Sequence, residues 1–226
     1  MTLDAPFAGK SSGLPLETRP VAAGVFMARV GDDVVLLDLR SDAYACLAGV
    51  GDGLVLTEAG VRADLGLLDL LADADLLERD PGPPRRPLPT APLRELDLPR
   101  LRWPLAHASS LLAAAWRAAS VGSRAPIRDL IGALPPPPSA RPDPARVASV
   151  VSGFRRLLPW VPGQGACLYR AFVLLTMLRR VGQDATWVFG VRTWPFGAHC
   201  WLQLEDAVLD DDPERVARYT PIMAVQ

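Results

Sequence analysis

Lysine is nearly absent from the sequence, in which Lys10 is the only lysine among 24 basic residues. We attribute this bias to a GC-rich coding sequence rather than to arginine chemistry. The basic residues are balanced by 25 acidic ones, which leaves a net charge of −1. So small a charge exerts no bulk attraction on nucleic acid or on a membrane surface, and we expect neither as a partner.

Cysteine is also scarce. Cys46, Cys167 and Cys200 cannot all be paired within one chain, and residues 1–6 do not have the pattern of a signal peptide. The longest apolar runs fall far short of a membrane-spanning helix. We therefore expect a soluble protein of the reducing cytoplasm.

The common motifs of cofactor and metal sites are missing as well. The sequence contains neither a GxxxxGK[ST] phosphate loop nor a GxGxxG turn. Its cysteines and two histidines lack paired CxxC or HxxxH spacing, and His107 is expected at a helix start or on the surface. We expect no bound metal and no bound cofactor.

Half of the residues are apolar, and 226 residues allow one large domain or two small ones. Residues 1–20 lack periodicity and predict a flexible arm. Residues 21–80 predict a small domain. The proline-rich residues 81–96 predict a semi-rigid linker, because proline disrupts both helices and sheet ladders.

Within the predicted small domain, two periodicities follow each other. Apolar segments separated by turn residues predict a three-stranded antiparallel sheet over 24–30, 34–39 and 43–47. From residue 48 to about 78 the leucines are spaced as on one face of a helix.

The remaining residues, 97–226, predict a second domain. Helices are expected over 106–119, 127–134, 146–158 and 167–180, and strands over 186–191, 198–204 and 207–210. The helix over 167–180 is apolar nearly all round, which is typical of a buried central helix. Helices followed by an antiparallel sheet indicate the α+β class.

A candidate catalytic site lies in this second domain. Cys167 begins the apolar helix, His199 follows 32 residues later, and three aspartates stand at 210–212. Cysteine, histidine and a carboxylate in this order are the parts of a thiol-based acyl-transfer site. A helix N-terminus lowers the pKa of a cysteine, and its free N–H groups can bind an oxyanion. Gln164 is a candidate second donor to that oxyanion.

Strand alternation over 198–205 puts His199 and Cys200 on opposite faces. The face of Cys200 is the more apolar, so Cys200 is expected to be a small buried hydrophobe and His199 to face the helix start. A two-residue turn after this strand pairs position 199 with 212, whereas a three-residue turn pairs it with 211. Periodicity therefore leaves Asp210, Asp211 and Asp212 all open as the partner of His199.

Each of these residues, taken singly, also suits a structural role. Cysteine is among the most buried residue types, a strand histidine commonly only forms hydrogen bonds, and consecutive aspartates suit a solvated turn. The structural interpretation weakens when the residues are taken together, because Cys167 starts a helix and His199 lies on the less apolar face.

Five short motifs follow one another along the second domain: CLYRA at 167–171, LRRVG at 178–182, VFGVR at 188–192, PFGAHCW at 195–201 and VLDD at 208–211. Together they closely resemble the B protein of lasso peptide biosynthesis. That family is a transglutaminase-like cysteine peptidase related to papain, and the likeness covers roughly residues 145–226.

The resemblance implies a role for each site residue. Cys167 is the nucleophile, His199 the general base and acid, and Asp211 the orienting carboxylate. The family usually has an Asn–Asp pair where this chain has Asp210 and Asp211. It usually has a small residue such as alanine at the position of Cys200.

The resemblance also implies a reaction and its partners. The B protein removes the leader from a ribosomally made precursor peptide. A partner cyclase similar to asparagine synthetase then closes the macrolactam ring. Whether the activity needs ATP stays open at this point.

Residues 21–80 resemble, more loosely, the winged-helix-like precursor-recognition element of such systems, in which helices follow a three-stranded sheet. The peptide chaperone of pyrroloquinoline quinone synthesis has the same arrangement. Such domains bind the leader as an added strand beside the third strand, against the last helix. The candidate leader-binding residues are Ala43, Tyr44, Ala45, Cys46, Leu68 and Leu71. The alternative for the leucines is a place in the core.

These observations predict a cysteine endopeptidase that binds the leader of a lasso precursor and cleaves it from the core peptide. The alternative is a non-catalytic adaptor that binds the precursor and scaffolds the cyclase. A third possibility is other amide or ester chemistry on the same fold, such as transamidation.

Overall fold

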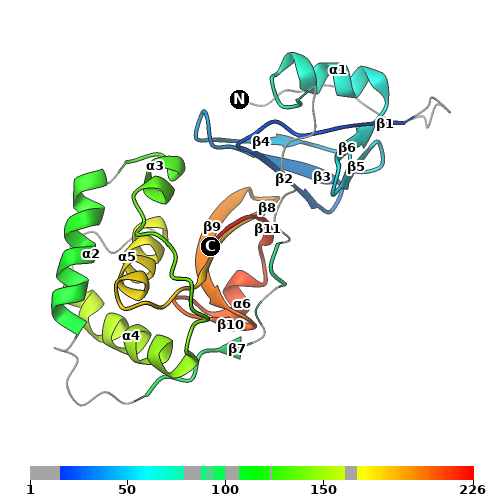
Figure 1. The fold of residues 1–226 in the computed structure, drawn as a ribbon. Helices are drawn as coiled ribbons and strands as arrows, with labels where there is room; N and C mark the ends of the chain where they lie inside the picture. The colour runs from blue at the N-terminus through cyan, green and yellow to red at the C-terminus, as the bar shows by residue number, and fades with distance from the viewer. Residues whose placement is uncertain are drawn as a thin grey trace. The chain divides into compact units, whose positions relative to one another are not determined.

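The computed structural model describes residues 16–78, 88–90, 92, 94–99, 107–122, 124–160 and 167–226. Contacts between residues divide the chain into two units (Figure 1). Unit 1 comprises Met1–Pro87 and Val191–Gly197, and unit 2 comprises Leu88–Gly190 and Ala198–Gln226. Most of the predicted linker and most of the predicted arm lie outside the described residues.

Unit 1 contains two three-stranded antiparallel sheets. The first is a meander of β2 (Val25–Val30), β3 (Asp33–Asp38) and β4 (Ala43–Leu47). The second has the order β1 (Glu17–Arg19), β6 (Gly60–Ala63) and β5 (Leu54–Thr57). The first sheet confirms the meander predicted from the sequence.

The second sheet corrects the helix predicted from residue 48 onward. β5 and β6 form a hairpin there, and the helix α1 covers only Leu65–Asp73. The β-branched Val55, Thr57 and Val61 favour strands, and this preference outweighs the leucine spacing. Gly60 has a φ of +136°, and a Cβ there would clash with the Arg19 carbonyl oxygen. With α1 the one helix described in unit 1, the winged-helix-like arrangement is not confirmed.

Helix α1 closes the core of unit 1. The carboxylate of Asp64 caps the helix by accepting a hydrogen bond from the Leu67 N–H at 3.0 Å. One face of the helix then places Leu68 and Leu71 in a cluster with residues of both sheets, including Val25, Leu36 and Leu54.

The turn between β8 and β9 also belongs to unit 1 by its contacts. The Trp194 indole N–H donates to Asp33 Oδ2 at 2.9 Å, and the Phe196 ring lies 5.7 Å from the ring of Tyr44. Asp33 also accepts the Gly49 N–H. These contacts hold the turn against β3 and β4.

Unit 2 contains four helices of six or more residues: α2 (Ala108–Val121), α3 (Ile127–Gly132), α4 (Pro144–Leu157) and α5 (Cys167–Arg180). A 3-10 turn, η2 (Leu158–Trp160), follows α4. Helix α5 is buried at every residue from 171 to 179. It packs against α2 and α4 and lies between these helices and the sheet (Figure 1). The predicted buried central helix is thereby confirmed.

The sheet of unit 2 has the order β11 (Thr220–Val225), β8 (Thr186–Arg192), β9 (Gly197–Leu204), β10 (Ala207–Val208) and β7 (Arg94–Glu95). Because β7 pairs with β10 in parallel, the last residues of the predicted linker belong to the sheet instead. The short helix α6 (Pro213–Val216) connects β10 to β11. Mixed sheets and helices confirm the α+β class.

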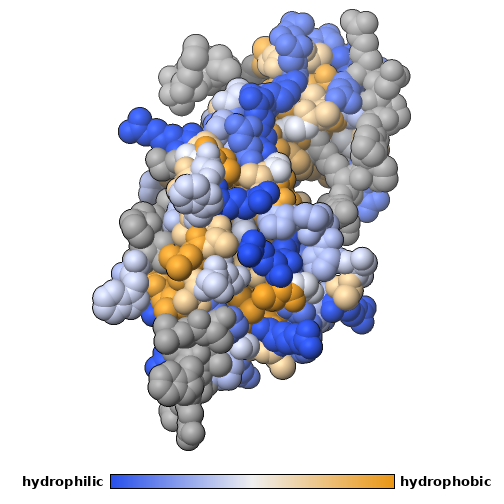
Figure 2. Space-filling view, turned by 60° about the vertical axis from the view of Figure 1, so that its left-hand side comes forward, coloured by the Kyte–Doolittle hydropathy of each residue, from blue (hydrophilic) through white to orange (hydrophobic). Residues whose placement is uncertain are grey.

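Some large apolar side chains remain exposed. Figure 2 shows hydrophobic side chains that reach the surface between hydrophilic ones. Among the described residues, the exposed ones of unit 2 include Leu112, Trp116 and Trp160. No helix in the described part of the chain is both long and apolar enough to cross a membrane.

Candidate active site

The site is built where the first turn of α5 meets β9. Cys167 is the first residue of α5 and is partly buried. Its sulfur is hydrogen-bonded by the side chain and backbone of Cys200 and by the side chain of His199. Two successive residues of one strand thus contact the sulfur that the helix presents.

His199 is fixed by Asp211. The His199 Nε2 lies 2.6 Å from Asp211 Oδ2, and both side chains are largely buried. Because Nε2 is bound to the carboxylate, Nδ1 is the ring nitrogen left for the Cys167 sulfur. The ring of Tyr219 lies 5.2 Å from the imidazole and that of Trp201 lies 6.4 Å from it, which limits its rotation.

Asp211 reaches His199 because the chain leaves the ladder after β10. The register pairs Ala207 with Leu204 and Val208 with Gln203, and if continued it would place position 212 opposite 199. The Leu209 N–H still donates to the Leu202 carbonyl, but residues 209–211 then bend. Strand parity alone therefore could not identify the partner of His199.

The other two aspartates have different roles. Asp210 is partly buried, and its Oδ1 accepts the Leu202 N–H at 2.8 Å, while its buried Oδ2 has no hydrogen-bond partner among the described residues. Asp212 caps α6 by accepting the N–H groups of Glu214 and Arg215. Of the three candidates, Asp211 alone contacts the imidazole in the described structure.

The electrostatics favour a thiolate beside an imidazolium. Hydrogen bonds from Cys200 and His199 lower the pKa of Cys167 to about 4, although burial opposes this shift. Hydrogen bonds to Asp211 and Cys167 raise the pKa of His199 to about 9. Burial raises the pKa of Asp211, but hydrogen bonds from His199 and the Asp212 N–H outweigh it, and the net pKa is lowered. Between about pH 4 and pH 9 the site thus holds an ion pair.

Cys200 does more than the sequence predicts. It is buried, as expected for a small hydrophobe, and burial raises the pKa of its thiol well above the usual value. The neutral thiol also donates to the Cys167 sulfur, so Cys200 belongs to the site. The less apolar face of β9, on which His199 lies, is also buried further along the strand, where Trp201 and Gln203 are both 1% exposed.

Arg170 is a site residue that sequence reasoning did not single out. It lies one turn after Cys167, and its Nη2 donates to the Asp210 carbonyl at 3.1 Å and to Asp211 Oδ2 at 3.3 Å. The guanidinium therefore ties α5 to the loop that carries Asp211. Its place three residues after a helix-starting cysteine was the available signal.

Gln164, the candidate oxyanion donor, lies outside the described residues. The described residues include no group of three or more histidine, cysteine or acidic side chains arranged to hold a metal ion. The atoms that are described provide an activated sulfur, a ring nitrogen that can exchange a proton, and a carboxylate that orients the ring. This set can carry out nucleophilic acyl transfer.

The predicted leader-binding residues divide into two groups. Ala43, Tyr44, Ala45 and Cys46 belong to β4, which pairs only with β3 among the described strands and so has one free edge. Leu68 and Leu71 are 0% and 2% exposed in the core of unit 1. These two leucines are core residues, which corrects their assignment to a binding face. On α1, Leu65 and Leu70 are the exposed leucines.

The free backbone groups of β4 can be identified from the register. The Leu39 N–H donates to the Gly24 carbonyl, so odd-numbered residues of β3 bond toward β2. Even-numbered residues of β3 then bond toward β4, where Leu36 is opposite Ala45. Along β4, the N–H and C=O groups of Cys46 therefore point to the edge that does not pair with β3.

An α+β layer with a cysteine at a helix start and a histidine on the adjacent strand contains the parts of a thiol acyl-transfer site. The family model of the transglutaminase-like superfamily matches residues 85–224, and the chain belongs to that superfamily. The transglutaminase-like part of the resemblance is thereby confirmed. No curated protein and no solved structure matches the chain.

Proposed function

We propose that this chain is a cysteine endopeptidase that removes the leader from a lasso precursor peptide before a partner cyclase closes the macrolactam. The observation that carries the proposal is the contact of Cys167 with His199, which is itself held by Asp211 at 2.6 Å. Membership of the transglutaminase-like superfamily supports the acyl-transfer chemistry. The sequence motifs from CLYRA to VLDD support the choice of substrate.

In the first half of the reaction, the Cys167 thiolate attacks the carbonyl carbon of the last leader residue. The carbonyl oxygen becomes an oxyanion beside the start of α5, where free N–H groups can stabilise it. The tetrahedral intermediate then collapses, and the C–N bond breaks as the His199 imidazolium protonates the leaving amine. The core peptide leaves, and the leader remains as a thioester on Cys167.

In the second half, neutral His199 removes a proton from a water molecule, and the resulting hydroxide attacks the thioester. The C–S bond breaks and the leader leaves as a carboxylic acid. His199 is protonated and Cys167 is again a thiolate, so the ion pair is restored. Asp211 stabilises the imidazolium in both halves and fixes its orientation.

Leader capture is assigned to the free edge of β4. The backbone N–H and C=O groups of Cys46 can pair with an extended peptide as an additional strand. Capture there raises the effective concentration of the cleavage junction at the thiol, since both lie on one chain.

The test uses the full chain and the short precursor peptide encoded beside its gene, with mass spectrometry of the products. We expect two fragments whose masses add up to that of the precursor plus one water, and we expect none with Cys167→Ala. Cleavage that persists in Cys167→Ala would overturn the proposal. The absence of a neighbouring precursor gene would overturn the choice of substrate.

Binding of a fluorescein-labelled leader separates this proposal from its alternatives. The Cys167→Ala variant should bind the leader as tightly as the wild type. If the wild type binds but does not cleave, the chain is an adaptor. If the leader fragment gains the mass of an added amine instead of water, the reaction is transamidation.

A further inference from the structure

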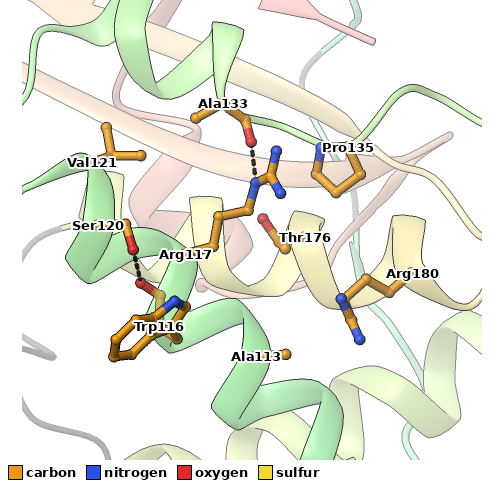
Figure 3. A pocket seen from close by; sticks show the side chains of 9 residues that line it. All are labelled: Ala113, Trp116, Arg117, Ser120, Val121, Ala133, Pro135, Thr176 and Arg180. Carbon is orange, nitrogen blue, oxygen red and sulfur yellow. Dashed lines mark hydrogen bonds between the residues drawn. The ribbon is translucent and has the colours of Figure 1, made fainter.

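A pocket of about 520 Å³ lies away from Cys167, among residues of α2, α5 and the end of α3 (Figure 3). Trp116 and Arg117 of α2 and Thr176 and Arg180 of α5 are among its lining residues. In Figure 3 the guanidinium groups of Arg117 and Arg180 lie on either side of Thr176. The mechanism above uses none of these residues.

The pocket carries positive charge that the two long helices beside it, α2 and α5, do not balance. The sequences of α2 and α5 contain no acidic residue. Arg117 donates through Nε to the Ala133 carbonyl, which leaves its two terminal nitrogens for other acceptors. Within the described part of the chain, neither Arg117 nor Arg180 forms an ion pair with a carboxylate. Arginine pairs well with carboxylates because its planar fork matches their two oxygens.

The pocket also has an unsatisfied polar group at its floor. Thr176 is 1% exposed, and its Oγ1 has no hydrogen-bond partner within the described part of the chain. Buried hydroxyl groups are normally hydrogen-bonded, and an unpaired one carries a desolvation cost. A ligand's hydrogen-bond acceptor that enters the pocket, with the Arg117 side chain moved aside, would accept a hydrogen bond from this hydroxyl.

Next to the charges lies an apolar strip. Trp116 is 76% exposed and Leu112 is 69% exposed. The two residues are four apart on α2 and therefore lie on the same face of the helix. Exposed tryptophan and arginine are the residue types that most often dominate binding at protein interfaces. Since Leu112 does not line the pocket, the strip extends farther than a small molecule in the pocket would cover.

We propose that the pocket and the Leu112–Trp116 strip dock an acidic segment of a partner protein that also carries an apolar side chain. Carboxylates of the segment pair with Arg117 and Arg180, and one acceptor reaches the Thr176 hydroxyl. The apolar side chain packs on Trp116 and Leu112. This inference is independent of the reaction proposed for Cys167.

The test is the panning of a phage library of random dodecapeptides on the full chain. A Trp116→Ala/Arg180→Glu double variant serves for counter-selection, and because both residues are exposed it should keep the wild-type melting temperature. We expect enriched peptides that combine aspartate or glutamate with leucine, phenylalanine or tryptophan. No enrichment over the double variant, or enrichment of peptides without acidic residues, would overturn the proposal.

The selected peptide is then labelled and its binding is followed by fluorescence anisotropy. We expect Trp116→Ala and Arg180→Glu each to weaken binding at least about tenfold. Thr176→Val should weaken it by a smaller factor, and added salt should weaken it further. Trp160→Ala and Arg146→Gln are matched controls, because they remove an exposed tryptophan and an exposed arginine elsewhere in unit 2. Equal losses in these controls would overturn the proposal.

A second copy of this chain is the competing occupant. Light scattering coupled to size exclusion distinguishes the two. If the wild type is a dimer and the Trp116→Ala/Arg180→Glu variant is a monomer, the surface binds a second copy of this chain. That result would overturn the proposal of an acidic partner. We expect the same mass for both proteins.

Discussion

The Cys167 site and the free edge of β4 are organised in different ways. At Cys167 the chemistry depends on particular side chains, with His199 Nε2 and Asp211 Oδ2 held 2.6 Å apart. At β4 the proposed binding depends on the main-chain groups of Cys46, which many sequences could supply. The first site can therefore be predicted from residue types, whereas identification of the second requires the strand register.

The difference also predicts how each region responds to substitution. Truncation of a side chain at the Cys167 site removes a chemical group that no other residue supplies. Side-chain truncation on β4 leaves the N–H and C=O groups in place, and only a change in the backbone removes them. Substitutions of the two kinds can therefore test whether this comparison holds.

The largest effect is expected from Asp211→Ala. Without the carboxylate, the His199 ring is free to rotate and its pKa falls, which in turn raises the pKa of the Cys167 thiol. We expect kcat/KM for precursor cleavage to fall about 100-fold, as when other residues that orient a catalytic group are removed. In the wild type we expect iodoacetamide to alkylate Cys167 at a constant rate between about pH 4 and pH 9. In the variant this pH range should narrow at both ends.

Asp212→Ala is the matched control for Asp211→Ala. It removes the α6 cap and should cost about 1 kcal/mol of stability. The Asp212 N–H that donates to Asp211 is retained, so cleavage should change less than about threefold. Equal losses in the two variants would mean that the loop as a whole, rather than the Asp211 carboxylate, sustains the site.

Much of this site could be predicted from the sequence because its parts are rare residue types at the ends of regular elements. A cysteine at a helix start and one of only two histidines on a strand are visible in the sequence. Periodicity left Asp210, Asp211 and Asp212 open, because a bend after Leu209 displaces Asp211 from its register position, and only the family resemblance pointed to Asp211. Arg170 was missed because its one signal, a place three residues after Cys167, does not tell which loop the guanidinium reaches.

A smaller effect is expected from Cys46→Pro. Proline removes the Cys46 N–H from the free edge, but the ladder with β3 uses Ala43, Ala45 and Leu47 and is retained. We expect leader binding by anisotropy to weaken about tenfold, while the alkylation rate of Cys167 is unchanged. Cys46→Val keeps the N–H and should bind as the wild type does. Loss of binding in both variants would assign the effect to the side chain.

The fold of unit 1 shows where the sequence misleads. The strands of the first sheet were predicted because apolar segments alternate with glycine and aspartate turns. The hairpin of β5 and β6 was predicted as helix because the leucines that follow it, from Leu65 to Leu77, have helical spacing, although Val55, Thr57 and Val61 favour strands. The hairpin also pairs with β1, where Arg19 is opposite Val61, and local periodicity does not contain such a contact between distant residues.

Asp210 and Asp211 offer a comparison of neighbouring carboxylates. Burial raises the pKa of Asp210 to about 6, whereas that of Asp211 is lowered. A raised pKa means that the folded state holds its proton more tightly than the unfolded state. Protonated Asp210 therefore makes its full contribution to the free energy of unfolding below about pH 4. This contribution is lost as the pH rises to about 6.

Asp210→Asn should remove this dependence, since the amide keeps the oxygen that accepts the Leu202 N–H and carries no charge. We expect the variant to gain stability over the wild type as the pH rises, by up to about 3 kcal/mol above pH 6. Urea unfolding at pH 4.5 and pH 7.5 measures this difference. A constant difference between the two pH values would show that the buried carboxylate is not the group that titrates.

The smallest effect is expected from Cys200→Ala. The variant removes the S–H donor to the Cys167 thiolate but keeps the Cys200 backbone N–H, which also donates to it. Losing one hydrogen bond of about 1 kcal/mol should lower the rate of alkylation near pH 4 about fivefold. Cys200→Ser restores a donor and should recover part of the rate. The fold should persist with alanine, because the cavity left by one sulfur is small. An unchanged pH profile in Cys200→Ala would mean that the low pKa of Cys167 depends on His199 and the backbone alone.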